Sequence, residues 1–291
     1  MKKFFLLIAG LALLSAIVGS VIGAQASSLT ALFAKGRTTK GSGKIVSRTL
    51  AVGKFDGVSS SRAIRVEIRE AKAGELLVEA DDNLLDKVVA KVDATGMLTI
   101  GFDKSVGSLS DIHVTVTVPY DERIGRLKAS SASRIVCESP LKARKVSLKA
   151  SSAANIEASA VTTECEVEAS SAANIDGTFK TRKCSFDLSS SACINADVTT
   201  ADCEADLSSA SRLELTGSAD RCKGNLSSAA TLHAEEFTVR NADFDTSSGA
   251  SARIRCTENL RAEASSGSSI RYTGECNVHA KTSSGGSVHK K

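Results

Sequence analysis

A pair of serines recurs nine times in the second part of the chain at an almost constant interval. The pairs begin at Ser130, Ser151, Ser170, Ser189, Ser208, Ser227, Ser247, Ser265 and Ser283. Successive starts are 21, 19, 19, 19, 19, 20, 18 and 18 residues apart. The phrase ASSAANI, found at 150–156 and again at 169–175, resembles a linker when it is considered alone. A constant period of this length instead indicates a solenoid, in which each repeat stacks on the one before it.

Within each repeat, apolar and polar residues alternate. Val146, Leu148 and Ala150 alternate with Ser147 and Lys149 before one serine pair, and the same pattern precedes the other pairs. After each pair comes a second short segment centred on an aliphatic residue: Ile135, Ile156, Ile175, Ile194, Leu213, Leu232, Ile254, Ile270 and Val288. A period of two is typical of a strand with one buried and one solvated face. Each repeat is therefore expected to be strand, tight corner, strand and loop.

We predict an all-β fold, a right-handed parallel β-solenoid with coils of about 19 residues, two main sheets and small-residue corners. Coils stacked in this way lie about 4.8 Å apart. Small side chains suit a crowded corner, where serine hydroxyls are expected to bond to the local backbone. Only 4% of the residues are aromatic and none is Trp, so the core is expected to be thin. A sandwich of antiparallel hairpins also has regular strands, but it would not need the same residue type at the same place in every unit.

The sequence before the serine repeats is also rich in strand patterns. We predict one solenoid domain over 44–291, with longer irregular coils at 44–128 and regular repeats at 129–291. The phrase SSSRAI at 59–64 resembles the later corners. Because the ends of a solenoid are exposed sheet edges, we expect an N-terminal cap within 44–70.

The N-terminus has the pattern of a targeting segment. Lys2 and Lys3 precede an apolar run, and Ala24-Gln25-Ala26 forms a cleavage signal. We interpret 1–26 as a signal peptide cut near Ala26 and 27–43 as a flexible lead-in, which places the mature chain outside the cytoplasm, in the periplasm, on the surface or secreted. An uncleaved N-terminal anchor is the alternative, because the apolar run is long. No later stretch is apolar enough to span a membrane.

The order of motifs resembles a known family. GKFDGVSSSRAIRVEI, LLVEADDNLLDKVVAKV, MLTIGF, HVTVTVP and the train of corners ending in IRYTGECNVHAKTSSGGSVHKK are similar to the putative autotransporter adhesin, head GIN domain family, over about 44–291. That family usually has Gly-Ser-Gly corners, whereas here only the last three contain glycine, at Gly249, Gly267 and Gly285. The resemblance implies a bacterial protein with a pectin-lyase-like superhelix and a role in surface adhesion. It implies no catalytic residues, so it constrains the fold more than the function.

Four of the eight cysteines share one register. Cys165, Cys184, Cys203 and Cys222 each lie five residues before a serine pair and are expected to stack inward as a structural ladder. Their spacing and an oxidising compartment allow disulfides 165–184 and 203–222. The alternatives are free buried thiols that fill space and, less favourably, a metal site, which a linear ladder does not suit. The remaining cysteines, Cys137, Cys193, Cys256 and Cys276, show no common register.

A column of acids lies two residues before successive serine pairs. Glu168, Asp187, Asp206 and Asp245 form a candidate cation site, because stacked carboxylates repel each other and Ca²⁺ binds carboxylate oxygens. The alternative interpretation is a solvated strand face that keeps the protein soluble. A sugar-cleaving site is a third interpretation, although this face has no aromatic platform for a sugar ring.

The sequence carries no enzyme motif. Its four histidines, His113, His233, His279 and His289, are dispersed. With a formal net charge of +4 and no basic patch interleaved with aromatics, the chain shows no feature that predicts nucleic-acid binding. We therefore predict a non-catalytic adhesin or interaction module without a cofactor, whose partner is an unidentified protein or glycan at the cell envelope. A polysaccharide-active enzyme and a purely structural envelope protein are the alternatives.

Overall fold

The computed structural model describes residues 38–291, so the expected signal peptide at 1–26 and the start of the expected lead-in lie outside the described residues. The described chain divides into two compact units, 38–41 with 104–111 and 42–103 with 112–291. In the smaller unit, β1 (Thr39–Lys40) pairs in parallel with β8 (Leu109–Ser110). No helix in the described part of the chain is long and apolar enough to cross a membrane.

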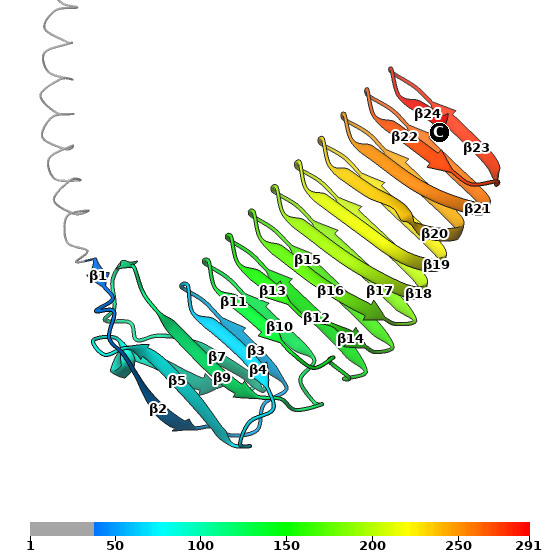
Figure 1. Ribbon diagram of the computed structural model, residues 1–291. Coiled ribbons are helices and arrows are strands. Elements are labelled where there is room, and N and C mark those ends of the chain that lie inside the picture. Colours follow the sequence, from blue (N-terminus) through cyan, green and yellow to red (C-terminus); the bar gives the residue numbers. More distant parts are fainter. Residues whose placement is uncertain (1–37) are drawn as a thin grey trace, which may run out of the picture. The chain divides into compact units, whose positions relative to one another are not determined.

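The larger unit is a β-solenoid whose strands stack coil upon coil (Figure 1). In the first regular coils, short strands precede and follow each corner: β10 (Arg126–Ala129), β11 (Arg134–Cys137), β12 (Lys145–Ala150), β13 (Asn155–Glu157), β14 (Ala160–Val161), β15 (Glu164–Ala169), β16 (Asn174–Lys180) and β17 (Lys183–Leu188). Long strands then run from one corner to the next: β18 (Cys193–Leu207), β19 (Arg212–Leu226), β20 (Thr231–Thr246) and β21 (Ser251–Ala264). The last strands are β22 (Ser269–Thr273), β23 (Asn277–Thr282) and β24 (Ser287–Lys290).

Strands of successive coils pair in parallel and in the register that the serine pairs indicate. Residues 145–150 of β12 pair with 164–169 of β15, which pair with 183–188 of β17 and 202–207 of β18. Strands that follow the corners pair in the same way, with Ile156 opposite Ile175 and Ile175 opposite Ile194. The predicted all-β solenoid with coils of about 19 residues is confirmed.

The first part of the larger unit combines parallel and antiparallel pairing. β3 (Gly57–Ser60) and β4 (Arg65–Arg69) pair in parallel with β10 and β11, and β7 (Met97–Phe102) and β9 (Val114–Pro119) lie beyond them. β2 (Ile45–Ala51), β5 (Glu75–Asp81) and β6 (Val88–Val92) pair antiparallel, with the 3-10 turn η1 (Leu85–Lys87) before β6. At the N-terminal end of the solenoid, one sheet therefore ends on β2 and the other on β6. The expected cap within 44–70 includes β2, but β6 lies outside that range.

The core is a narrow layer between the two sheets. Inward positions are aliphatic or small, and the largest fully buried side chains in the regular coils are Phe179, Phe186, Phe237 and Phe244. Gly224 lies opposite Phe244 in the next coil, and a Cβ at Gly224 would lie 2.3 Å from the phenyl ring. A glycine in one coil thus makes room for an aromatic ring in the next, because the interior is close-packed.

Each corner is a tight turn with two consecutive residues in the left-handed conformation. At the second corner, Ser152 and Ala153 have φ of 53° and 59°, and the Ala154 N–H donates to the Ser151 carbonyl at 3.2 Å. This is the geometry of a type I′ turn, which normally favours Asn and Gly. The Ala153 N–H donates to Ser171 O of the next coil at 2.9 Å, so stacking satisfies the corner backbone. Arg62 and Ala63 have the same positive φ, and the resemblance of SSSRAI to a corner is confirmed.

Candidate interaction surface

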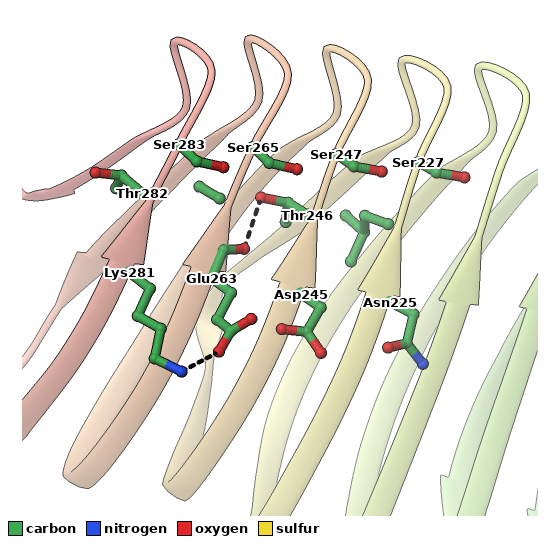
Figure 2. Close-up of a pocket in the computed structure, with 12 residues that line it drawn as sticks. Asn225, Ser227, Asp245, Thr246, Ser247, Glu263, Ser265, Lys281, Thr282 and Ser283 are labelled. Carbon is green, nitrogen blue, oxygen red and sulfur yellow. Dashed lines mark hydrogen bonds and ion pairs between the residues drawn. The ribbon is translucent and has the colours of Figure 1, made fainter.

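The first serine of each corner forms a row along the edge of the sheet that precedes the corners. Figure 2 shows the side chains of Ser227, Ser247, Ser265 and Ser283 side by side at equivalent places in four coils. Ser130, Ser151, Ser170, Ser189 and Ser208 occupy the same position in the earlier coils. Within residues 38–291, none of these nine hydroxyls makes a hydrogen bond to the protein. The expected bonds from these hydroxyls to the local backbone are therefore absent, because coil-to-coil backbone bonds already satisfy the corner.

The predicted acidic column lies beside this serine row on the outward face of the same sheet. Glu168, Asp187 and Asp206 are direct neighbours in three successive coils. Asp245 is separated from Asp206 by Asn225, whose side-chain amide donates to Asp206 Oδ1 at 2.6 Å. Three of the four predicted residues are thus adjacent, and an amide interrupts the column before the fourth.

Charges along this column are partly compensated by ion pairs between coils. Lys149 Nζ lies 2.7 Å from Glu168 Oε1, and Lys281 Nζ lies 3.1 Å from Glu263 Oε1. Asp187 has no ion pair within the described residues, and burial together with the charges of Glu168 and Asp206 raises its pKa. The centre of the column is therefore its most negative part.

Within residues 38–291, no group of three or more His, Cys, Asp or Glu side chains is arranged to hold a metal ion. Neighbouring carboxylates of the column are one coil apart, and their strands run side by side without converging on one point. The cation site remains a prediction from the sequence, to be tested by metal titration.

Two hollows lie between the serine row and the charged column. The larger, with a volume of about 720 Å³, spans four coils from Asn225 and Ser227 to Lys281 and Ser283 (Figure 2). The second, of about 300 Å³, is lined by the equivalent positions of earlier coils, including Lys149, Glu168 and Asp187. Because the same strand positions form both, we call these two hollows together the corner groove; residues 206–208, in the coil between them, line neither hollow.

The four cysteines of the predicted ladder stack in register inside the solenoid. Cys165 lies opposite Cys184, Cys184 opposite Cys203, and Cys203 opposite Cys222; all four are buried and free. A hydrogen bond with the neighbouring thiol and burial both raise the pKa of Cys184 and Cys203. The four side chains fill space in the narrow core as small apolar groups. The disulfides 165–184 and 203–222 remain a prediction from the sequence, which thiol titration with and without reductant would test.

One pair of cysteines that the sequence left unconnected shares an environment. Burial, together with the nearby Cys256 thiol, raises the pKa of Cys276 to about 11. Cys256 lies 9 residues after Ser247 and Cys276 lies 11 residues after Ser265, in coils of equal length, so a comparison of register did not reveal their proximity. The histidines are not brought together in this way: His113 lies near Asp81 before the regular coils, and His233 lies near Glu214 within them.

Comparison with known proteins gives a consistent result. The chain matches the profile of the family described as putative auto-transporter adhesin, head GIN domain, over residues 54–197 and 166–276. It is similar in structure to a putative adhesin from Parabacteroides merdae, with a TM-score of 0.67, 20% identity, and 87% of this chain and 99% of that chain covered. A putative adhesin from Parabacteroides distasonis gives a TM-score of 0.67 and 19% identity, with 87% and 100% covered.

A third solved structure, a putative lipid binding protein from Parabacteroides distasonis, has a TM-score of 0.62 and 17% identity, with 88% of this chain and 100% of that chain covered. At these identities the likeness concerns the fold alone. No curated protein matches the chain closely enough to count as a relative.

Proposed function

Because the chain belongs to the putative auto-transporter adhesin, head GIN domain family, we propose that it is a non-catalytic interaction module that works outside the cytoplasm, at the cell envelope. The observation that carries the proposal is the corner groove, whose hollows each cross several coils and expose serine hydroxyls that make no hydrogen bond within the described residues. A regular solenoid offers the same strand positions over many coils, so it can contact a long partner at many equivalent points.

Location and binding can be tested together. The protein should be found in the envelope or culture fluid after cell fractionation, and the purified chain should bind saturably to at least one glycan or matrix protein of a broad panel. A protein confined to the cytoplasm, or one that binds nothing in the panel, would refute the proposal. A purely structural envelope protein would be found in the envelope but would bind nothing in the panel.

One observation favours a polysaccharide-active enzyme as the second candidate. Asp187 has a raised pKa and is flanked by Glu168 and Asp206, and paired carboxylates with unequal acidity cleave glycosidic bonds in many enzymes. An assay for new reducing ends on a series of polysaccharides tests this alternative. Turnover that disappears in Asp187→Asn would make the protein an enzyme and overturn the first proposal.

A further inference from the structure

Cys256 and Cys276 lie in the same gap between the last two stacked coils. β21 pairs first with β22 and then with β23, and the two blocks of pairs leave residues 256–258 and 274–276 unpaired with each other. Cys256 begins the first of these short stretches and Cys276 ends the second. Because no ladder fixes one stretch against the other, their backbones can adjust more readily than those of continuous strands.

The thiol of Cys256 points along this gap toward Cys276. Cys256 Sγ lies 3.1 Å from the carbonyl oxygen of Asn259, and Asn259 lies opposite Asn277, the residue that directly follows Cys276. At the other end of the gap the two coils touch, since a Cβ at Gly274 would collide with the Cys256 carbonyl oxygen. The influence of the Cys256 thiol on the pKa of Cys276 agrees with this arrangement. The fold therefore brings the two sulfur atoms to one place.

The two thiols differ in their access to solvent. Cys256 is fully buried, whereas Cys276 is half-buried, so a reagent in solution meets Cys276 first. Any adduct formed on Cys276 then has a second thiol beside it. The cysteine ladder lacks this asymmetry, because its four members are all buried within paired strands.

We propose that Cys256 and Cys276 form a disulfide that fastens the last coil to the coil before it. The reaction is thiol–disulfide exchange, with a disulfide compound as the oxidant. The Cys276 thiolate attacks one sulfur of the oxidant, which forms a mixed disulfide and releases the first thiol. The Cys256 thiolate then attacks the sulfur of Cys276, which forms the Cys256–Cys276 bond and releases the second thiol. Two cysteine thiols are oxidised, one disulfide is reduced, and the two cysteine protons end on the released thiols.

The position of this bond gives it a structural consequence. Within the described residues, β23 pairs only with β21 and β24 only with β22, so the last coil is held from one side. Elements held in this way open more readily than the interior of a structure. A bond between Cys256 and Cys276 closes a loop that contains the Ser265 corner and β22, and such a closure restricts the unfolded chain. The oxidised chain should therefore resist unfolding better than the reduced chain.

The bond can be detected directly. The purified chain is reduced, freed of reductant and incubated with oxidised glutathione at mildly alkaline pH, where thiolates form more readily. Remaining thiols are then blocked with N-ethylmaleimide, and the chain is digested with trypsin. Cleavage after Arg and Lys places the two cysteines in separate peptides, 256–261 and 272–281, so mass spectrometry identifies the bond as these two peptides joined.

Two variants show whether the pairing is specific. Cys276→Ser removes the accessible partner. Cys193→Ser is the matched control, because Cys193 is also half-buried but its neighbours in the adjoining coils are Asn174 and Arg212. Urea unfolding of each chain is measured before and after oxidation, and free thiols are titrated under both conditions.

We expect the joined peptides in the wild type and in Cys193→Ser, with a loss of two of the eight thiols of the wild type. Oxidation should raise the urea midpoint of both chains and leave that of Cys276→Ser unchanged. Glutathione on Cys276 without the joined peptides, or joined peptides from the cysteine ladder alone, would overturn the pairing. A joined pair with an unchanged midpoint would overturn its fastening role. This inference goes beyond the proposed function, and none of these results bears on binding at the corner groove.

Discussion

The corners offer the most direct test of how the solenoid is built. Ala153, Ala172 and Ala210 each have φ of 59°, and each follows a serine that is also left-handed. An L-residue in this conformation is strained because its Cβ approaches the following carbonyl oxygen, at a cost of about 1–2 kcal/mol. Replacing these three alanines by glycine removes that strain and leaves the backbone N–H that donates to the next coil.

The expected gain follows from two opposing terms. Relief of strain contributes about 1–2 kcal/mol per corner. Glycine is also more flexible than alanine in the unfolded chain, which lowers the free energy of unfolding by about 0.5–1 kcal/mol per substitution and offsets part of this gain. The midpoints of these two ranges differ by about 0.7 kcal/mol per corner, so the free energy of unfolding of the triple variant should be about 2 kcal/mol higher than that of the wild type.

The assay is urea unfolding followed by far-UV circular dichroism, with the midpoint and slope compared between variants. Ala51→Gly is the matched control, since Ala51 is exposed like the corner alanines but lies in β2 with negative φ. This control should lose about 0.5–1 kcal/mol. A triple variant that is no more stable than the wild type would show that the alanine corners are not strained and would refute the reasoning.

Other residues give independent predictions. Cys184 is buried, so it should resist iodoacetamide at neutral pH and react only when the chain unfolds. Cys276, with a pKa of about 11, should react faster as the pH rises toward that value. Mass spectrometry identifies the labelled sites, and rapid labelling of Cys184 in the folded chain would contradict the buried ladder. Folding raises the pKa of Asp187, so its ionised form opposes folding above the folded pKa and its protonated form does not. Asp187→Asn should therefore raise the free energy of unfolding by less than about 1 kcal/mol at neutral pH, and urea titrations should show this gain vanishing as the pH falls below the usual value of 3.8. In the same urea titration, Gly224→Ala should lower the free energy of unfolding by about 1–3 kcal/mol, because the new Cβ would clash with the Phe244 ring. Gly53→Ala, with open space around the new Cβ, should lower it little. Equal losses of stability in the two variants would contradict the packing of Gly224 against Phe244.

The regular coils were predictable because every repeat obeys the same local rules. Alternation before each serine pair fixes which side chains enter the core, and the constant interval fixes which coil positions meet. Asn155 and Asn174 illustrate this: the repeated phrase predicts that they face outward beside each other, and Asn174 Nδ2 donates to Asn155 Oδ1 at 3.2 Å. The same register predicts the stack of Cys165, Cys184, Cys203 and Cys222.

The first part of the chain and the last cysteine pair were not predictable in this way. Residues 45–51 and 75–81 alternate as any half-buried strand does, and alternation does not distinguish a parallel coil from the antiparallel pair that they form. Cys256 and Cys276 lie at different intervals from their serine pairs, so only the fold of the loop between them reveals that they are neighbours.

The amino-acid sequence alone determined the period, the inward and outward faces and the positions of the corners, because these depend on side chains only a few residues apart. Tertiary structure alone decided which charges pair between coils, how the N-terminal sheets end, and that the serine row and the charged column flank a groove. These features depend on how coils separated by about 19 residues are placed in space, since the shape of a surface and the strength of its electric field arise only when the strands are stacked.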